Sequence, residues 1–229
     1  MNTNDTFSFE ELSPTGIHWF TDTIGIIICP TNIGVIAVDS IKEKDSKDIY
    51  LIDSGPNKDI AEHIYSCLQK QFPKFKLKAI IDTHSHADHC GANKKLVELT
   101  GCKIYSTLME KSGIECPLNQ SAVAYGAFPL PEYLSSYYLA EPSTVDKVIK
   151  SDERFNLNNS TTIQCIALPG HYYEMIGVLC TYSKDEKEIK EYKEEELALK
   201  ERLEIISVNE PSMSDILHYL DEFNSPLFN

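Results

Sequence analysis

The segment from residue 84 to residue 89 constrains the chain more than any other, because it concentrates three histidines and an aspartate. Its sequence is His84-Ser85-His86-Ala87-Asp88-His89. The segment directly follows an apolar run at residues 79–81, which predicts a buried strand that ends where the histidines begin. Imidazole nitrogens and carboxylate oxygens are the ligands that hold zinc at about 2 Å. The sequence therefore predicts a metal site in a loop at the edge of a sheet.

The two halves of this segment can face two different ions. In a bend after the strand, His84 and His86 can point at one ion, while Asp88 and His89 are turned toward a second ion on the other side. The alternative is a solvated histidine-rich loop. The chain has seven histidines, and three of them lie in this segment, which makes that alternative the weaker one.

His171 is the next candidate ligand. It follows a Pro-Gly pair at the end of a second apolar run, residues 161–168, so it can arrive at the same sheet edge as the first cluster. A lone histidine after Pro-Gly is usually a turn residue, but next to the first cluster it is the predicted third ligand of the first metal. Asp53 follows another apolar run, and we interpret it from the residues alone as an ordinary turn former.

Short β-branched runs alternate with helical patterns along the first part of the chain. Strands are expected at residues 24–29, 34–38, 49–52, 78–82, 103–105, 161–168 and 175–182. Apolar residues recur every four positions between 59 and 72, which predicts an amphipathic helix, and a second helix is expected over 94–100. Residues 112–143 are rich in Pro, Gly, Tyr and Ser. They predict a long, partly ordered insertion over one face, for which a functional role and a plain surface loop are equal alternatives.

The last part of the chain differs in composition from the rest. Beyond residue 182 it becomes dense in Glu and Lys, with a thin apolar stripe typical of a charged helix. We therefore expect two parts: a domain over residues 1–182, and a charged helical extension over residues 183–229 that packs on or beside it.

Composition narrows the class of partner and the compartment. The net charge of −14 argues against binding to nucleic acid or to an anionic membrane, because both need a positive field. No secretory signal or membrane-length apolar stretch is visible, and the seven cysteines show no CxxC pairing. We expect reduced thiols, a cytoplasmic location and a small-molecule substrate; the oligomeric state is left open.

These motifs together resemble the metallo-β-lactamase superfamily, whose hallmark is HxHxDH after a buried strand. The hallmark stands complete at residues 84–89, residues 51–55 (Leu-Ile-Asp-Ser-Gly) resemble the second motif, and residues 169–171 (Pro-Gly-His) resemble the third. The resemblance covers roughly residues 15–182. It implies an α+β fold, a four-layer αββα sandwich with two mixed sheets face to face and helices outside.

The resemblance also implies the ligands and the chemistry. His84, His86 and His171 would hold the first metal, usually zinc, and Asp88 and His89 would hold the second. Family chemistry is hydrolysis by metal-activated water, and Asp88 is the candidate catalytic residue beside its role as a ligand.

Two departures from the family pattern affect the second metal. The third motif usually continues as PGHTxG, whereas this chain has Tyr172-Tyr173-Glu174. The family's bridging aspartate follows a further apolar strand, and no such strand is predicted after residue 182. Candidate replacements in the tail fall in charged or helical segments: Asp185, Asp215, Asp221 and, for the last family histidine, His218. We expect a C-terminal part replaced by charged helices, one tightly bound Zn²⁺, and weak or no occupancy of a second site.

Two function classes follow. The first is a zinc-dependent hydrolase of a small ester, thioester or lactam-like substrate. The alternative is a non-catalytic metal-binding relative with a partner-binding or regulatory role, which the incomplete second site favours. A nuclease of the same superfamily is disfavoured by the acidic charge and by the short chain, which leaves no room for an added nucleic-acid domain.

Overall fold

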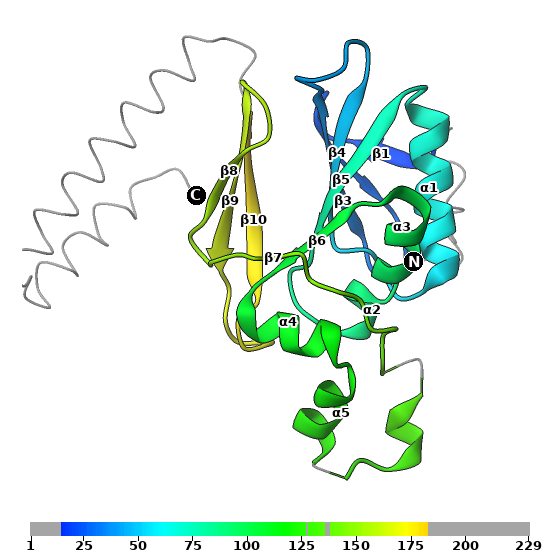
Figure 1. The fold of residues 1–229 in the computed structure, drawn as a ribbon, viewed down its shortest axis with the longest axis vertical. Helices are drawn as coiled ribbons and strands as arrows, with labels where there is room; N and C mark the ends of the chain where they lie inside the picture. The colour runs from blue at the N-terminus through cyan, green and yellow to red at the C-terminus, as the bar shows by residue number, and fades with distance from the viewer. Residues whose placement is uncertain (1–14, 127, 136–137, 183–229) are drawn as a thin grey trace, which may run out of the picture. The chain divides into compact units, whose positions relative to one another are not determined.

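The larger of two sheets has seven strands, in the order β1-β2-β3-β4-β5-β6-β7 (Figure 1). The computed structural model describes residues 15–126, 128–135 and 138–182. The strands are β1 (Ile17–Trp19), β2 (Ile24–Ile27), β3 (Ile33–Asp39), β4 (Lys47–Ile52), β5 (Phe75–Ile81), β6 (Lys103–Ser106) and β7 (Lys147–Val148). Pairing is antiparallel from β1 to β4 and parallel from β4 to β7, so the carboxyl ends of β4, β5 and β6 meet at one edge.

The smaller sheet is antiparallel and has the order β10-β9-β8. Its strands are β8 (Arg154–Asn156), β9 (Thr161–Ala167) and β10 (Ile176–Tyr182). The two sheets face each other in Figure 1, and their facing side chains form a shared core. That core includes Ile36 and Ile81 from the larger sheet and Ile163, Cys165 and Ile176 from the smaller one.

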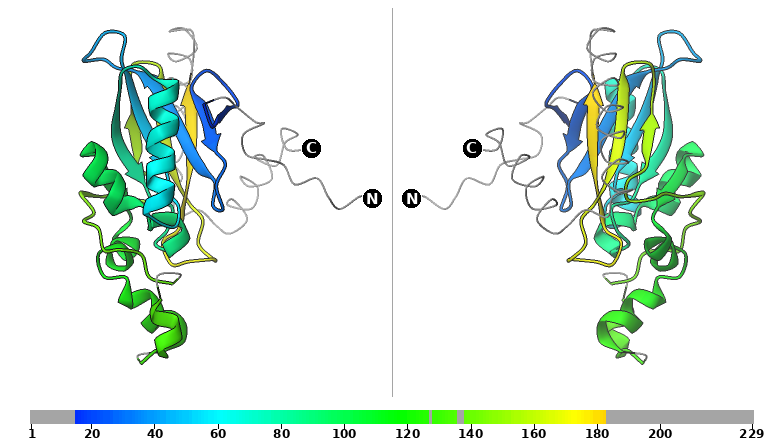
Figure 2. Two further views of the ribbon diagram at one scale, coloured as in Figure 1. Left: turned by 90° about the vertical axis from the view of Figure 1, so that its right-hand side faces the viewer. Right: turned by 90° about the vertical axis from the view of Figure 1, so that its left-hand side faces the viewer.

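The helices are α1 (Lys58–Gln71), α2 (Ala87–Cys90), α3 (Asn93–Thr100), α4 (Leu108–Glu115), α5 (Leu118–Tyr125) and the 3₁₀ helix η2 (Pro131–Leu134). The helices α1 and α3 cover the other face of the larger sheet, and α4 and α5 lie beyond the ends of its strands (Figure 1). In Figure 2, α1 lies across one face of the larger sheet and the smaller sheet lies across the opposite face. The described residues therefore form three layers: helices, a mixed sheet and a second sheet.

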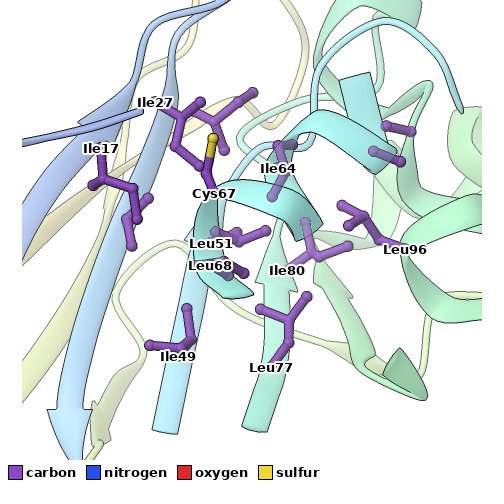
Figure 3. Packing of buried hydrophobic residues seen from close by; sticks show 14 of the residues in the cluster. Ile17, Ile27, Ile49, Leu51, Ile64, Cys67, Leu68, Leu77, Ile80 and Leu96 are labelled. Carbon is purple, nitrogen blue, oxygen red and sulfur yellow. The ribbon is translucent and has the colours of Figure 1, made fainter. Parts of the chain in front are cut away.

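The sequence explains why α1 begins and packs as it does. The Asn57 side chain accepts hydrogen bonds from the backbone amides of Asp59 and Ile60, which satisfies donors that a helix start otherwise leaves free. Four-residue spacing then places one apolar stripe against the sheet, where Ile64 and Leu68 are fully buried among the strand side chains (Figure 3). Each such side chain contributes about 1.5–3 kcal/mol on burial.

The α+β fold and the two facing sheets predicted from the sequence are confirmed. Each strand predicted up to residue 182 is present within a few residues of its expected bounds. The predicted charged extension covers residues 183–229, which lie outside the described part, and its boundary at residue 182 adjoins them. The predicted fourth layer is not among the three layers of the described residues. The extension and the fourth layer stay predictions.

The segment predicted as a partly ordered insertion is more regular than expected. Much of it is helical, in α4, α5 and η2. Two of its turn-forming residues mark the ends of a helix: Pro117 precedes α5, and Gly126, with φ of 96°, follows it. Among the described residues, no helix has the length and apolar character needed to cross a bilayer.

Candidate metal centre

The edge where the parallel strands end carries the histidine cluster. Residues 82–86 leave the end of β5, and the short helix α2 follows. His171 lies in the connection between β9 and β10, which belong to the other sheet. A backbone hydrogen bond of 3.0 Å from the amide of Ile176 to the carbonyl of Thr83 joins the two sheets at this point. The fold therefore brings His171 to the first cluster, as predicted.

Three imidazoles converge at this edge. The Nε2 atom of His84 lies 3.0 Å from Nδ1 of His86, which lies 3.1 Å from Nε2 of His171. One nitrogen from each of the three rings lies within 4.8 Å of the other two. His84 is buried, His86 is half-buried and His171 is exposed, so the cluster is open on one side. Within the described part of the chain, no other histidine, cysteine or carboxylate joins this group.

The surroundings keep two of these rings neutral. Burial lowers the pKa of His84 to about 3, and the nearby rings of His89, His86 and His171 add to this effect. Burial and the neighbouring His171 also lower the pKa of His86 below its ordinary value. A neutral imidazole presents a lone pair, so both rings are in the form that binds a metal at neutral pH.

Asp53 orients two of the histidines. It lies just after β4 with φ of 62°, in the left-handed region, and it is buried. Its Oδ2 atom accepts hydrogen bonds from the Thr83 hydroxyl, at 2.9 Å, and from Nδ1 of His89, at 2.7 Å. The Thr83 hydroxyl oxygen in turn lies 3.0 Å from Nδ1 of His84. Because the Thr83 hydroxyl donates its proton to Asp53, its oxygen accepts from Nδ1 of His84, and the Asp53 carboxylate accepts from Nδ1 of His89. In the neutral form of each ring, the Nε2 lone pair is then free.

Asp88 and His89 lie next to each other on α2, and the His89 ring packs against His84 with 4.0 Å between centroids. Oδ2 of Asp88 lies 3.5 Å from Nε2 of His89 and accepts a hydrogen bond from the Thr31 hydroxyl at 3.2 Å. Burial opposes the charged form of His89, but the hydrogen bond and charge of Asp53, together with Asp88, raise its pKa above the ordinary value. The predicted second pair is therefore present as a pair, with Asp88 exposed.

A buried carboxylate on α4 holds the main chain between the first two histidines. Oε2 of Glu110 accepts hydrogen bonds from the amide and the hydroxyl of Ser85, and its Oε1 accepts one from the amide of Glu174. The side-chain amide of Gln120 donates to the Ser85 carbonyl at 2.8 Å. Burial raises the pKa of Glu110, and the hydrogen bonds from Ser85 and Glu174 oppose that rise.

The unusual third motif packs against the cluster. The Tyr172 ring meets the His86 ring edge-on with 4.8 Å between centroids, so it covers one side of the site. The carboxylate of Glu174 accepts from the amide of Met109 at the start of α4, and the Thr107 hydroxyl donates to the Glu174 carbonyl. Tyr172 and Glu174, which stand where the family pattern has small residues, therefore make contacts with His86 and with the start of α4.

Two residues of the site were not found from the residue pattern. Asp53 was interpreted as a turn former, but it is the acceptor that orients Thr83 and His89. Its place after a strand parallel to β5 was a usable signal, as was its place in the second family motif. Glu110 carried no signal, because it lies between the strand expected at residues 103–105 and the insertion expected from residue 112, where the sequence shows no motif.

A sequence model described as the metallo-beta-lactamase superfamily matches residues 27–149. The chain belongs to this superfamily. No curated protein sequence matches the chain significantly.

Solved structures of similar fold are metallo-β-lactamases. BJP-1, a subclass B3 enzyme of Bradyrhizobium japonicum, superposes with a TM-score of 0.57 at 20% identity, covering 75% of this chain and 58% of its own. The Cronobacter sakazakii enzyme with the HARLDQ motif gives 0.55 at 16% identity, covering 72% and 60%. GOB-18 of Elizabethkingia meningoseptica gives 0.55 at 17%, covering 74% and 57%. The chain thus spans less than two thirds of the length of these relatives, and the likeness at this identity concerns the fold.

Proposed function

We propose that this chain is a metal-dependent hydrolase that uses Zn²⁺ to cleave a small ester, thioester or lactam-like substrate. The convergence of His84, His86 and His171 carries the proposal. Their nitrogens lie within 4.8 Å of one another, although they come from two different sheets and from positions far apart in the sequence. Membership in the metallo-β-lactamase superfamily supports the same reaction class.

The donor set fits zinc. Three imidazole nitrogens with an open fourth position form the ligand set of many catalytic zinc sites. His84 and His86 have lowered pKa values, so neither ring must lose a proton before a metal binds near neutral pH. Three lone pairs directed at one point repel one another, and a cation placed between them removes that repulsion. When bound, the metal would supply Lewis acidity and make a water molecule easier to deprotonate.

The chain's own residues supply binding, orientation and a base. Thr83 and Asp53 fix the His84 tautomer, which keeps its Nε2 directed at the other two rings. Asp88 has an exposed carboxylate next to the cluster, so it is placed to accept a proton from water. Tyr172 covers one side of the cluster and keeps bulk water from that direction.

The test measures metal and hydrolysis on the same protein. The full chain is stripped with a chelator, reloaded with Zn²⁺ and assayed for bound zinc and for cleavage of p-nitrophenyl acetate, an aryl thioester and a β-lactam. We expect zinc to bind, at least one probe to be cleaved, and both properties to be lost in His84→Ala. The matched control is His18→Ala, an exposed histidine in β1 outside the cluster. Full zinc binding by His84→Ala would contradict the proposal.

A non-catalytic metal-binding role is the second candidate. The observation that favours it is the absence, among the described residues, of a carboxylate that joins the Asp88–His89 pair to the three histidines. In that case zinc would bind and vanish with His84→Ala, but no probe would be cleaved faster than in buffer with zinc alone.

A further inference from the structure

A pocket of about 680 Å³ lies beside the histidine cluster. One of its walls is the metal-site segment itself, through His86 and Asp88. Another wall comes from Tyr125 at the end of α5 and from residues 138–141. Ligand sites for small molecules typically have volumes of about 300–1,000 Å³, so this space is large enough to hold one.

The wall formed by Tyr125 and residues 138–141 is largely aromatic and apolar. Tyr125 and Tyr138 line it, and their rings meet edge-on at 5.7 Å. Tyr125 also stacks on Tyr133, with 4.0 Å between centroids and 9° between the ring planes. The Tyr125 side chain is held by these neighbours, yet the residue keeps 45% of its surface exposed. A fixed, exposed ring is a surface on which a flat or apolar group can pack.

Three charged side chains line the pocket: Lys58, Asp88 and Glu141. Glu141 forms an ion pair with Lys94 at 3.1 Å, and Asp88 accepts a hydrogen bond from the neutral Thr31 hydroxyl and lies 3.5 Å from Nε2 of His89. Lys58 also lines the pocket, and within the described residues its ammonium group forms no ion pair or hydrogen bond. Among the described residues, Lys58 is therefore the one lysine or arginine that lines this pocket, and it has no anionic partner.

Helix stability does not account for Lys58. It is the first residue of α1, where the helix dipole is positive and disfavours a cation. Long-range attraction of anions does not account for Lys58 either, because the chain as a whole carries a net charge of −14 and repels anions at a distance. A lysine in this place attracts a negatively charged group at short range.

We propose that the pocket binds a substrate with an aromatic body and an anionic group such as a carboxylate, with the ring against Tyr125 and Tyr138 and the anion at Lys58. This inference rests on the proposed hydrolase function and deepens it. The scissile carbonyl then lies toward His86 and Asp88. Water forms the new C–O bond, the acyl–oxygen or acyl–sulfur bond breaks, and a proton passes to the leaving oxygen or sulfur, with no redox change.

The binding test uses a matched pair that needs no turnover. 4-Hydroxyphenylacetate and its neutral amide, 4-hydroxyphenylacetamide, are titrated into the full zinc-loaded chain by ligand-observed NMR. We expect the acid to bind about fivefold more tightly, the size typical of one partly exposed ion pair, with the preference falling as salt rises. Lys58→Met should remove the preference. Lys70→Met, at the far end of the same helix, should keep it.

The activity test uses the acetate esters of the same two phenols, which have nearly equal leaving groups. We expect a lower KM for the acid with unchanged kcat, and loss of that difference in Lys58→Met. Tyr125→Ala should raise KM for both esters, and Tyr125→Phe should restore it, because the ring and not the hydroxyl packs on the substrate. Melting temperatures are measured beside KM: Tyr125→Phe, which keeps the ring, should match the wild type in both, and a raised KM in Tyr125→Phe would overturn the ring contact.

The outcomes separate the two proposals. Equal binding of acid and amide by the wild-type chain, or a preference that survives Lys58→Met, overturns the pocket assignment even if the esters are cleaved. A charge preference that depends on Lys58, with no cleavage of either ester, supports the pocket and contradicts the hydrolase proposal.

Discussion

Oε2 of Glu110 accepts hydrogen bonds from the backbone amide of Ser85 at 2.9 Å and from its hydroxyl at 2.6 Å. Ser85 stands between the first two histidines of the cluster. The other oxygen of the same carboxylate accepts from the amide of Glu174, close to His171, at 3.1 Å. One buried side chain on α4 therefore contacts the main chain of both loops that carry the histidines.

Glu110→Ala should destabilise the chain and weaken metal binding together. It leaves the buried amide and hydroxyl of Ser85 and the partly buried amide of Glu174 without an acceptor. An unmade buried hydrogen bond costs about 1–3 kcal/mol, so we expect a loss of about 2–4 kcal/mol. Zinc affinity should fall because the His171 loop loses its link to Ser85. Urea unfolding and zinc competition with a chromogenic chelator measure both effects. Glu98→Ala, at an exposed carboxylate on α3, should cost under about 0.5 kcal/mol. Equal losses in the two variants would contradict the role of Glu110.

Asp53→Asn should weaken metal binding with little change in packing. The asparagine keeps the shape, but its amide donates where His89 and Thr83 now donate, so the tautomer that frees both Nε2 atoms is no longer favoured. Loss of such an orienting partner typically lowers metal affinity about 10- to 100-fold. Zinc competition measures the change, and Asp39→Asn, which only breaks a surface ion pair with Lys47, is the control. An unchanged zinc affinity in Asp53→Asn would show that the network does not orient the ligands.

The parts of the fold set by local patterns could be predicted, and those set by packing could not. Alternating β-branched runs and the stripe of α1 predict strands and helix because each pattern acts over a few residues. The three histidines could be placed at one edge because each follows an apolar strand. Glu110 lies 25 residues after Ser85 in a segment rich in helix ends, so its contact depends on how α4 docks. Asp53 lies 30 residues before Thr83, and the two meet only because β4 and β5 are parallel neighbours.

The metal-free chain should lose stability as the pH falls through the acidic range. The pKa of His84 is about 3 in the folded chain and about 6.5 when unfolded. Between these values the unfolded chain binds a proton that the folded chain does not, so unfolding becomes easier as the pH falls. One such group contributes at most about 1.4 kcal/mol per pH unit. Urea unfolding with EDTA, from about pH 7.5 to about pH 5, should show a shallower pH dependence in His84→Asn than in wild type. His63→Asn should keep the wild-type slope, and identical slopes in His84→Asn and wild type would refute the assignment.

The last prediction concerns the number of metals and the role of Asp88. Asp88 and His89 offer two ligands where a stable zinc site normally has three or four, and no described carboxylate joins them to the three histidines. Without such a bridge, two cations about 4 Å apart repel each other strongly even at an effective dielectric near 20. We therefore expect one tightly bound zinc per chain, measured by elemental analysis after dialysis.

If one zinc suffices, the carboxylate of Asp88 acts mainly as the proton acceptor. Asp88→Asn should then lower kcat by about 10²- to 10⁴-fold, the usual contribution of a general base, while the bound zinc stays at one per chain. Thr31→Val is the matched control, because it removes the hydroxyl that donates to Asp88 and leaves the carboxylate in place; its kcat should change far less. Two tightly held equivalents of zinc in the wild type, or loss of the single zinc in Asp88→Asn, would mean that Asp88 is a metal ligand in a complete second site.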